Sequence, residues 1–281
     1  MASNRRVTGY LLMLPGAIWL GLFFVIPFYS LIAASLYDPK GSVLSGYHVA
    51  YHFGNFGDAF SAYHAELFRS LLYAAVSSLI CLVVGYVLAY AIAFKAGRWR
   101  TLLLVLVIAP FFTSFLLRTL SWKLILADNG FVVSTLRHLH VLGADGRLLN
   151  TSFAVIAGIV YNFLPFMVLP LYASLEKIDG RLVEAASDLY ASPVKAFFKV
   201  TWPLSMPGVV AGTLLTFIPA AGDYINAQLL GSPQQRMVGQ TIQSLFSTDY
   251  AKAGALSVML MAIIVVLVMV YIRKAGTEEL L

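Results

Sequence analysis

Long apolar runs constrain this sequence more than any other feature. There are six of them, at residues 10–36, 71–94, 102–126, 152–175, 204–222 and 253–272. A bilayer core about 30 Å thick needs roughly 20 apolar residues for each helical crossing. Only 11% of the residues are charged, whereas an ordinary soluble domain carries about 25%. The sequence therefore predicts an all-α, polytopic membrane protein of about six transmembrane helices, in a single transmembrane domain over residues 1–281.

The first run follows Arg5 and Arg6 and is 27 residues long. A signal-peptide core has about 7 to 15 apolar residues, so we expect this run to remain as a membrane anchor. Several spans contain proline, which neighbouring helices can accommodate in a membrane. We interpret these prolines, Pro110 among them, as kinks within continuous helices.

Lys and Arg residues alternate in density between successive connections, and such a bias sets orientation in the membrane. With the N-terminus inside, 11 lie on the cytoplasmic side and 7 on the outer side. Six of the outer residues lie in the loops at about 37–70, 127–151 and 223–252, and the seventh is Lys123 at the outer end of the third span. Arg118 stands within a span. The bias predicts both termini in the cytoplasm of a multi-pass protein in the bacterial inner membrane.

Reactive motifs are absent from the sequence. It has no GxxxxGK[ST] phosphate-binding loop and no HExxH zinc motif. Cys81 is the single cysteine and is expected to be apolar packing. Two histidine pairs, His48 with His52 and His138 with His140, lie in predicted outer loops without clustered acids, which favours solvated histidines over a metal site. We therefore predict no catalytic residue and no metal ligand. No chain of acids or histidines runs through the spans, which disfavours a proton-coupled secondary transporter.

The connection between the fourth and fifth spans, about residues 176–205, contains the sequence Glu184-Ala185-Ala186 and is called the EAA-type loop. Asp179 is a plausible N-cap, followed by apolar residues at helical spacing up to Tyr190. Ser192 and Pro193 begin a second helix, which we expect to run to Thr201 before Pro203 ends it. Two short amphipathic helices on the cytoplasmic side are predicted.

Charges of one sign share a face on each of these helices. Glu184 and Asp188 are four residues apart, as are Lys195 and Lys199. Such a pair costs a few tenths of a kcal/mol in an isolated helix. Two interpretations are open. In the first, the charges of the two helices neutralise each other or are simply solvated. In the second, the charges contact a partner protein.

The loop resembles the EAA loop of binding-protein-dependent ABC importer permeases. Glu184, Ala185 and Ala186, followed by Val200, Trp202 and Pro203, match its pattern, whereas Tyr190 stands where the family usually has glycine. The resemblance implies the type I importer permease fold, in which this loop is a coupling helix inserted into an ATPase subunit. The implied coupling residues are Glu184, Ala185, Ala186, Asp188, Tyr190 and Pro203.

Two further segments resemble the spermidine/putrescine importer permeases. The first segment comprises PFFT at 110–113, LRTLSW at 117–122 and ILADNG at 125–130. The second segment is GDYINAQLLG at 222–231. This resemblance implies a complex with a second permease subunit, two ATPase subunits and an extracytoplasmic binding protein. ATP and Mg would then bind the ATPases, and this chain would bind no cofactor. The net charge of +6 does not indicate nucleic-acid binding, because the basic residues lie at helix ends and not in one block.

The sequence thus predicts a permease that moves a small solute inward, with ATP hydrolysed on separate subunits; a polyamine such as spermidine or putrescine is the first candidate. The same architecture with another substrate, such as an amino-acid derivative or an opine, is the alternative. Arg118, Trp122, Asp223 and Tyr224 are the candidates for the solute path. If both spans are straight helices rising about 1.5 Å per residue, Arg118 and Asp223 lie at similar depth near the outer mouth, and pair or face each other.

Overall fold

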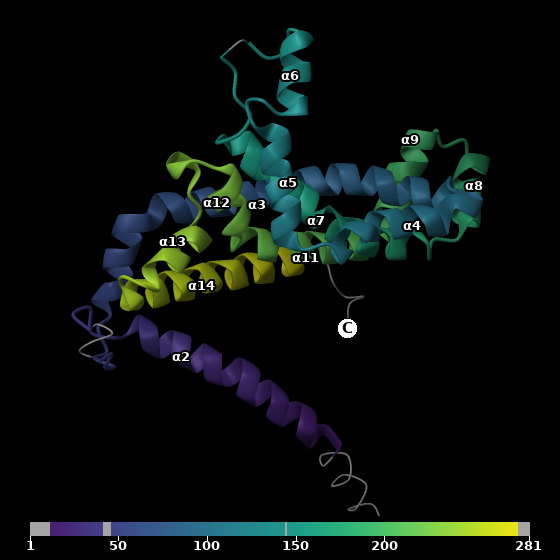
Figure 1. The fold of residues 1–281 in the computed structure, drawn as a ribbon. Helices are drawn as coiled ribbons and strands as arrows, with labels where there is room; N and C mark the ends of the chain where they lie inside the picture. Colours follow the sequence, from purple (N-terminus) through teal and green to yellow (C-terminus); the bar gives the residue numbers. More distant parts are fainter. Residues whose placement is uncertain (1–11, 42–45, 144, 275–281) are drawn as a thin grey trace, which may run out of the picture. The chain divides into compact units, whose positions relative to one another are not determined.

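A computed structural model describes residues 12–41, 46–143 and 145–274 of the chain (Figure 1). Within these ranges the structure is helical, without a named strand, and one isolated bridge joins Tyr37 to Val49. Arg5, Arg6 and Tyr10, at the start of the first predicted span, lie outside the described residues. The elements in chain order are a π-helical turn η1 (Gly21–Val25), α2 (Ile26–Ser35), α3 (Gly54–Phe94), η2 (Gly97–Trp99), α4 (Arg100–Ile108), η3 (Ala109–Phe112), α5 (Phe115–Leu126), α6 (Phe131–His138), α7 (Ser152–Leu175), α8 (Gly180–Asp188), α9 (Pro193–Ala196), a π-helical turn η4 (Phe197–Thr201), α10 (Trp202–Leu204), α11 (Met206–Ala221), α12 (Ile225–Leu230), η5 (Pro233–Gln235), α13 (Val238–Leu245) and α14 (Tyr250–Lys274).

Four of the helices among the described residues are long and apolar enough to cross a membrane. They are Leu12–Ser35, α3, α7 and α14. Two further bent pairs, Gly97–Phe112 with Phe115–His138 and Pro193–Leu204 with Met206–Ala221, bring the number to six if each pair is one span. The prediction of an all-α polytopic protein is confirmed.

The third predicted span differs from the expected continuous helix. Its two halves meet at 95°, and Thr113 and Ser114 between them are extended, with ψ of 150° and 135°. The Thr113 amide and hydroxyl both donate to the carbonyl of Pro110, at 3.1 and 2.7 Å, and close the end of the first half. Pro110 therefore precedes a break rather than a kink, and the depth that we counted along a straight helix to Arg118 is wrong.

The predicted outer loops are partly helical. Helix α3 begins at Gly54, well before the expected Leu71, and runs for 41 residues with one non-helical residue, Tyr63. The second and third of these loops contain α6, and α12 with α13. Hydropathy detects the apolar part of a helix alone, so polar helical extensions beyond the bilayer core escape a search for spans.

The residue contacts group into two compact units, which we describe separately. The prediction of a single domain stays a prediction. In the unit of residues 1–64 and 241–262, the Asn55 amide donates to the carbonyls of Ser35 and Tyr37 at 3.0 and 2.8 Å. These bonds join the end of α2 to the start of α3.

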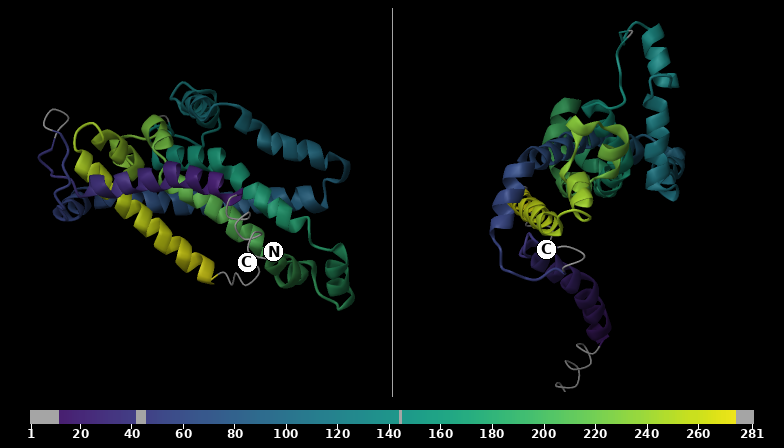
Figure 2. Two further views of the ribbon diagram at one scale, coloured as in Figure 1. Left: turned by 90° about the horizontal axis from the view of Figure 1, so that it is seen from below. Right: turned by 60° about the vertical axis from the view of Figure 1, so that its left-hand side comes forward.

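The unit of residues 65–240 and 263–281 is built on α7 and α11, which lie side by side (Figure 1; Figure 2). A Cβ added at Gly208 would lie 2.6 Å from Ser174 Cβ and 2.7 Å from the Pro170 carbonyl oxygen. Glycine is thus what allows the two backbones to approach, as small residues do between membrane helices. Helix α12 packs against α5 and the first half of α7, while α8 and α9 lie beyond the other end of α7.

Candidate functional site

The EAA-type loop folds as two capped helices. The Asp179 carboxylate accepts from the Arg181 amide at 3.0 Å and begins α8. The Ser192 hydroxyl accepts from the Lys195 amide at 3.4 Å and begins α9, with Pro193 in its first position. Both predicted N-caps are confirmed.

The end of the second helix was predicted wrongly. The helix continues through η4 and α10 to Leu204, so Pro203 lies inside it. A proline lacks the N–H that a regular turn would use; here the turn is widened, and the Trp202 amide reaches back to the carbonyl of Phe197. The chain instead turns at Ser205, where α11 departs at 64°.

The charged residues of the loop face outward. Glu184, Asp188, Lys195 and Lys199 are all exposed, and Ala185 is exposed beside Glu184, whereas Val183 and Ala186 are half-buried. Among the described residues no ion pair joins these acids to these lysines. The two helices therefore do not neutralise each other, and the acids of α8 are open to a partner.

Tyr190 occupies a backbone position that favours glycine. Its φ is +59°, and the amides of Tyr190 and Ala191 bond to the carbonyls of Ser187 and Ala186 at 2.9 and 3.0 Å. This is the Schellman pattern at a helix C-terminus, whose left-handed residue is usually glycine. The tyrosine side chain is 98% exposed, so no packing within the chain compensates for the strain.

Aromatic residues join the loop to α3. Tyr86 packs against Phe197 and Trp202 with ring centroids 5.5 and 5.3 Å apart, and its hydroxyl lies 2.8 Å from the Ser205 hydroxyl. On the other side, Arg100 at the start of α4 bonds both Glu176 and Tyr172. These contacts hold the loop against the spans, and the sequence contains no spacing that would have identified them.

The path candidates Arg118, Trp122, Asp223 and Tyr224 come from α5 and from the break between α11 and α12. Arg118 and Asp223 are 9% and 7% exposed. Trp122 is half-buried and packs edge-on against Tyr161, and Tyr224 is 39% exposed. All four belong to one compact unit.

Asp223 is held by polar neighbours instead of by a cation. Its carboxylate accepts from the Asn226 amide N–H at 3.1 Å and from the Asn226 side chain. The Asn226 Oδ1 atom in turn accepts from Asn162 at 3.2 Å and from Thr119 at 3.4 Å. This buried network of Thr119, Asn162, Asp223 and Asn226 joins α5, α7 and α12.

Arg118 lies against aromatic rings. Its guanidinium is 5.5 Å from the Phe111 ring centroid and 5.6 Å from that of Phe115. Its Nε and Nη1 atoms are buried without a hydrogen-bond acceptor, and among the described residues no ion pair joins it to Asp223. Direct pairing of the two charges is therefore not seen in this conformation.

Thr119, Asn162 and Asn226 of this network were not among the site residues predicted from the sequence. A signal for Asn162 was present, since an amide in the middle of an apolar span must find a partner in the protein. Gly158, one turn earlier, is also explained by the fold, because a Cβ there would lie 2.4 Å from Leu230 Cδ1 and 2.7 Å from Asn226 Oδ1 and would displace these side chains.

The family model described as "Binding-protein-dependent transport system inner membrane component" matches residues 5–275. The chain belongs to this family. It is 38% identical to the spermidine/putrescine transport system permease protein PotB of Haemophilus influenzae, over 91% of this chain and 90% of that protein. With the PotB of Escherichia coli K12 it shares 39% identity over 76% and 78% of the two chains.

A solved structure shares the fold of this inner membrane component. It is a bacterial alginate ABC transporter in complex with a periplasmic protein that carries an alginate pentasaccharide. The TM-score is 0.73 over 98% of this chain and 96% of that one, at 18% identity. The predicted type I importer permease fold is confirmed, and the two bent pairs are compatible with six spans.

Replacing Tyr190 of this permease by glycine should stabilise the end of α8 by about 1 kcal/mol, since the left-handed conformation costs roughly that much with a Cβ. Hydrogen exchange of the segment 186–191 should slow about fivefold. Leu189→Gly is the matched control, because Leu189 has φ −84° and gains nothing from glycine. Equal acceleration of exchange in both variants would contradict the strain at Tyr190.

Proposed function

We propose that this chain is one permease subunit of an ATP-driven importer of polyamines such as spermidine or putrescine. The observation that carries the proposal is the 38% identity to a spermidine/putrescine permease along nearly the whole of both chains. Asp223 is the one buried carboxylate among the described residues, and it offers a negative site to a cationic solute. Another small metabolite, such as an amino-acid derivative or an opine, is the alternative substrate.

The proposed complex contains a second permease, two ATPase subunits and an extracytoplasmic solute-binding protein. ATP and Mg would bind the ATPases, and this chain would act without a cofactor and without catalysis of its own. The exposed acids of α8 support docking of the EAA-type loop on an ATPase, and the periplasmic protein bound to the alginate transporter supports a binding-protein partner.

The test is uptake into proteoliposomes that hold the purified complex, with ATP inside and the binding protein outside. Radiolabelled putrescine and spermidine should accumulate, and ATP hydrolysis should rise with the loaded binding protein. Accumulation that follows a proton gradient without ATP would instead indicate a secondary transporter. Stimulation by an amino-acid derivative but not by either polyamine would overturn the substrate.

The buried charges Arg118 and Asp223 are proposed to line the solute path. Asp223→Asn should lower uptake at least about tenfold at equal membrane abundance, since a bond between a buried charge and a cationic solute contributes about 1.5–3 kcal/mol. Arg118→Gln should also lower uptake, because it removes the guanidinium that packs against Phe111 and Phe115. The exchange Arg118→Asp with Asp223→Arg should not restore uptake, because each charge has other neighbours here.

Recovery of uptake by that exchange would show that the pair forms in another conformation. Two fully active single variants would remove both charges from the path. Lys123→Gln is the control, because Lys123 is an exposed charge on the same helix α5.

The proposed topology places both termini and the EAA-type loop in the cytoplasm. In a Cys81→Ala background, Ser61→Cys should react with an impermeant thiol reagent in intact cells, while Arg98→Cys should react only after lysis. Both positions are exposed. The reverse labelling pattern would invert the topology.

A further inference from the structure

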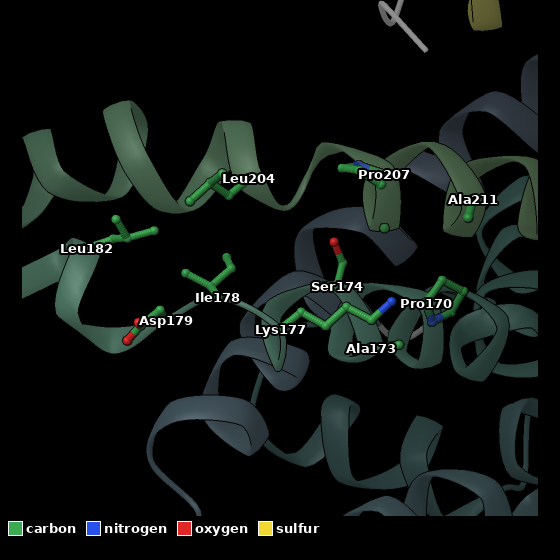
Figure 3. Close-up of a pocket in the computed structure, with 11 residues that line it drawn as sticks. Pro170, Ala173, Ser174, Lys177, Ile178, Asp179, Leu182, Leu204, Pro207 and Ala211 are labelled. Atoms are coloured by element: carbon green, nitrogen blue, oxygen red, sulfur yellow. The ribbon is translucent and has the colours of Figure 1, made fainter. Parts of the chain in front are cut away.

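A groove lies along the end of α7, α10 and the start of α11, beside the close contact at Gly208 (Figure 3). Its volume is about 620 Å³, and most of the side chains that line it are aliphatic or proline. Pro170 and Ala173 form one wall, and Leu204, Pro207 and Ala211 form the other. The groove begins at the EAA-type loop and continues along the two spans.

One cation enters this apolar groove. Lys177 follows the last turn of α7, and its side chain runs back into the groove toward Pro170 (Figure 3). Among the described residues no carboxylate pairs with it. Lys177 is exposed, and its ammonium lies over the apolar wall, where it can bind an anion. Asp179 is the carboxylate of the lining, and it accepts from the Arg181 amide.

The apolar residues that line the groove limit which anions can bind there. A free phosphate would satisfy Lys177 but leave the apolar walls uncovered, and a polyamine would be repelled by the ammonium. An anion with a long apolar tail satisfies both. On the proposed topology this end of α7 faces the cytoplasmic leaflet, whose anionic lipids attract basic side chains near the surface.

We propose that the groove binds an anionic phospholipid of the cytoplasmic leaflet, with the phosphate at Lys177 and an acyl chain along Pro170, Leu204 and Ala211. The bound lipid fills the space between the spans and the EAA-type loop, since Lys177 and Asp179 of the lining connect α7 to α8 and Leu182 of the lining belongs to α8. Coupling of ATP hydrolysis to uptake then depends on anionic lipid. Lipid binding itself is independent of which solute is carried.

The test begins with lipid retained by the purified complex in detergent, counted by native mass spectrometry after extraction from membranes that contain phosphatidylglycerol. Lys177→Gln should lower retention about fivefold, since one basic residue near an anionic surface contributes about 1 kcal/mol. Lys274→Gln is the matched control: it removes the same charge at the end of α14, outside the groove, and should retain wild-type lipid. Ala211→Phe fills the groove, leaves Lys177 in place and should also lower retention.

The second measurement is ATP hydrolysis stimulated by the binding protein in nanodiscs. Stimulation should be higher with phosphatidylglycerol than with phosphatidylcholine alone, and Lys177→Gln should abolish that difference. Inorganic phosphate added to phosphatidylcholine nanodiscs should not replace the lipid. Equal retention by wild type and Lys177→Gln, equal loss in Lys274→Gln, or rescue by phosphate would each overturn the proposal. So would impaired assembly with the second permease in Lys177→Gln at normal lipid retention, which would make a protein the occupant of the groove.

Discussion

Reversing the charge of Glu184 should abolish ATP-driven uptake and detach the ATPase from the complex. Glu184 lies four residues from Asp188 on the exposed face of α8, and the loop contains no internal cation that pairs with either of them among its described residues. Its acids are therefore available to basic groups of a partner. Placing a like charge in a matched interface costs several kcal/mol, which exceeds the 1.4 kcal/mol of a tenfold loss in affinity.

Glu184→Lys is tested by co-purification of the ATPase and by uptake, both at equal membrane abundance. We expect co-purification to fall more than tenfold. Asp145→Lys makes the same change at an exposed residue outside the EAA-type loop and should leave both measurements unchanged. Normal assembly together with normal uptake in Glu184→Lys would remove the coupling role from this residue.

Asn226→Leu should destabilise the permease by on the order of 2–5 kcal/mol. The substitution keeps a similar volume but removes the donor to Asp223 and the acceptor for Asn162 and Thr119. Each buried polar group left without a partner costs about 1–3 kcal/mol. Hydrogen bonds between membrane helices often contribute less than this. We therefore expect the lower end of the range of destabilisation if α12 shifts and the unpaired groups find other partners.

The change is measured as the thermal unfolding midpoint of the purified complex, with uptake as the second measurement. Gln228→Leu is the matched control, because Gln228 is exposed on the same short helix α12. A large loss in Asn226→Leu with none in Gln228→Leu would assign the effect to the buried network. Equal stability of the two variants would show that the network does not hold α12 between α5 and α7.

The N-caps of the EAA-type loop could be predicted because each depends on a few consecutive residues. Asp179 and Ser192 cap the amides that follow them within three residues. The strain at Tyr190 was visible as a departure from the family's glycine, but its cause became clear only with φ at +59° and the Schellman bonds. The EAA pattern of the sequence identified Glu184. Only the structure showed that Lys195 and Lys199 form no ion pair with it, which leaves its carboxylate available to a partner.

The sequence by itself determined that the chain is an all-α polytopic membrane protein, because lipid accepts no unpaired backbone group and selects apolar helices of about 20 residues. It did not determine the 95° break at Thr113 and Ser114, because a proline in a span is compatible with either a kink or a break, and the packing of neighbouring helices decides between them. Nor could it bring Asn162 of α7, Thr119 of α5 and Asn226 of α12 together. A buried polar atom requires a partner, but which of many distant residues provides it depends on how the helices pack.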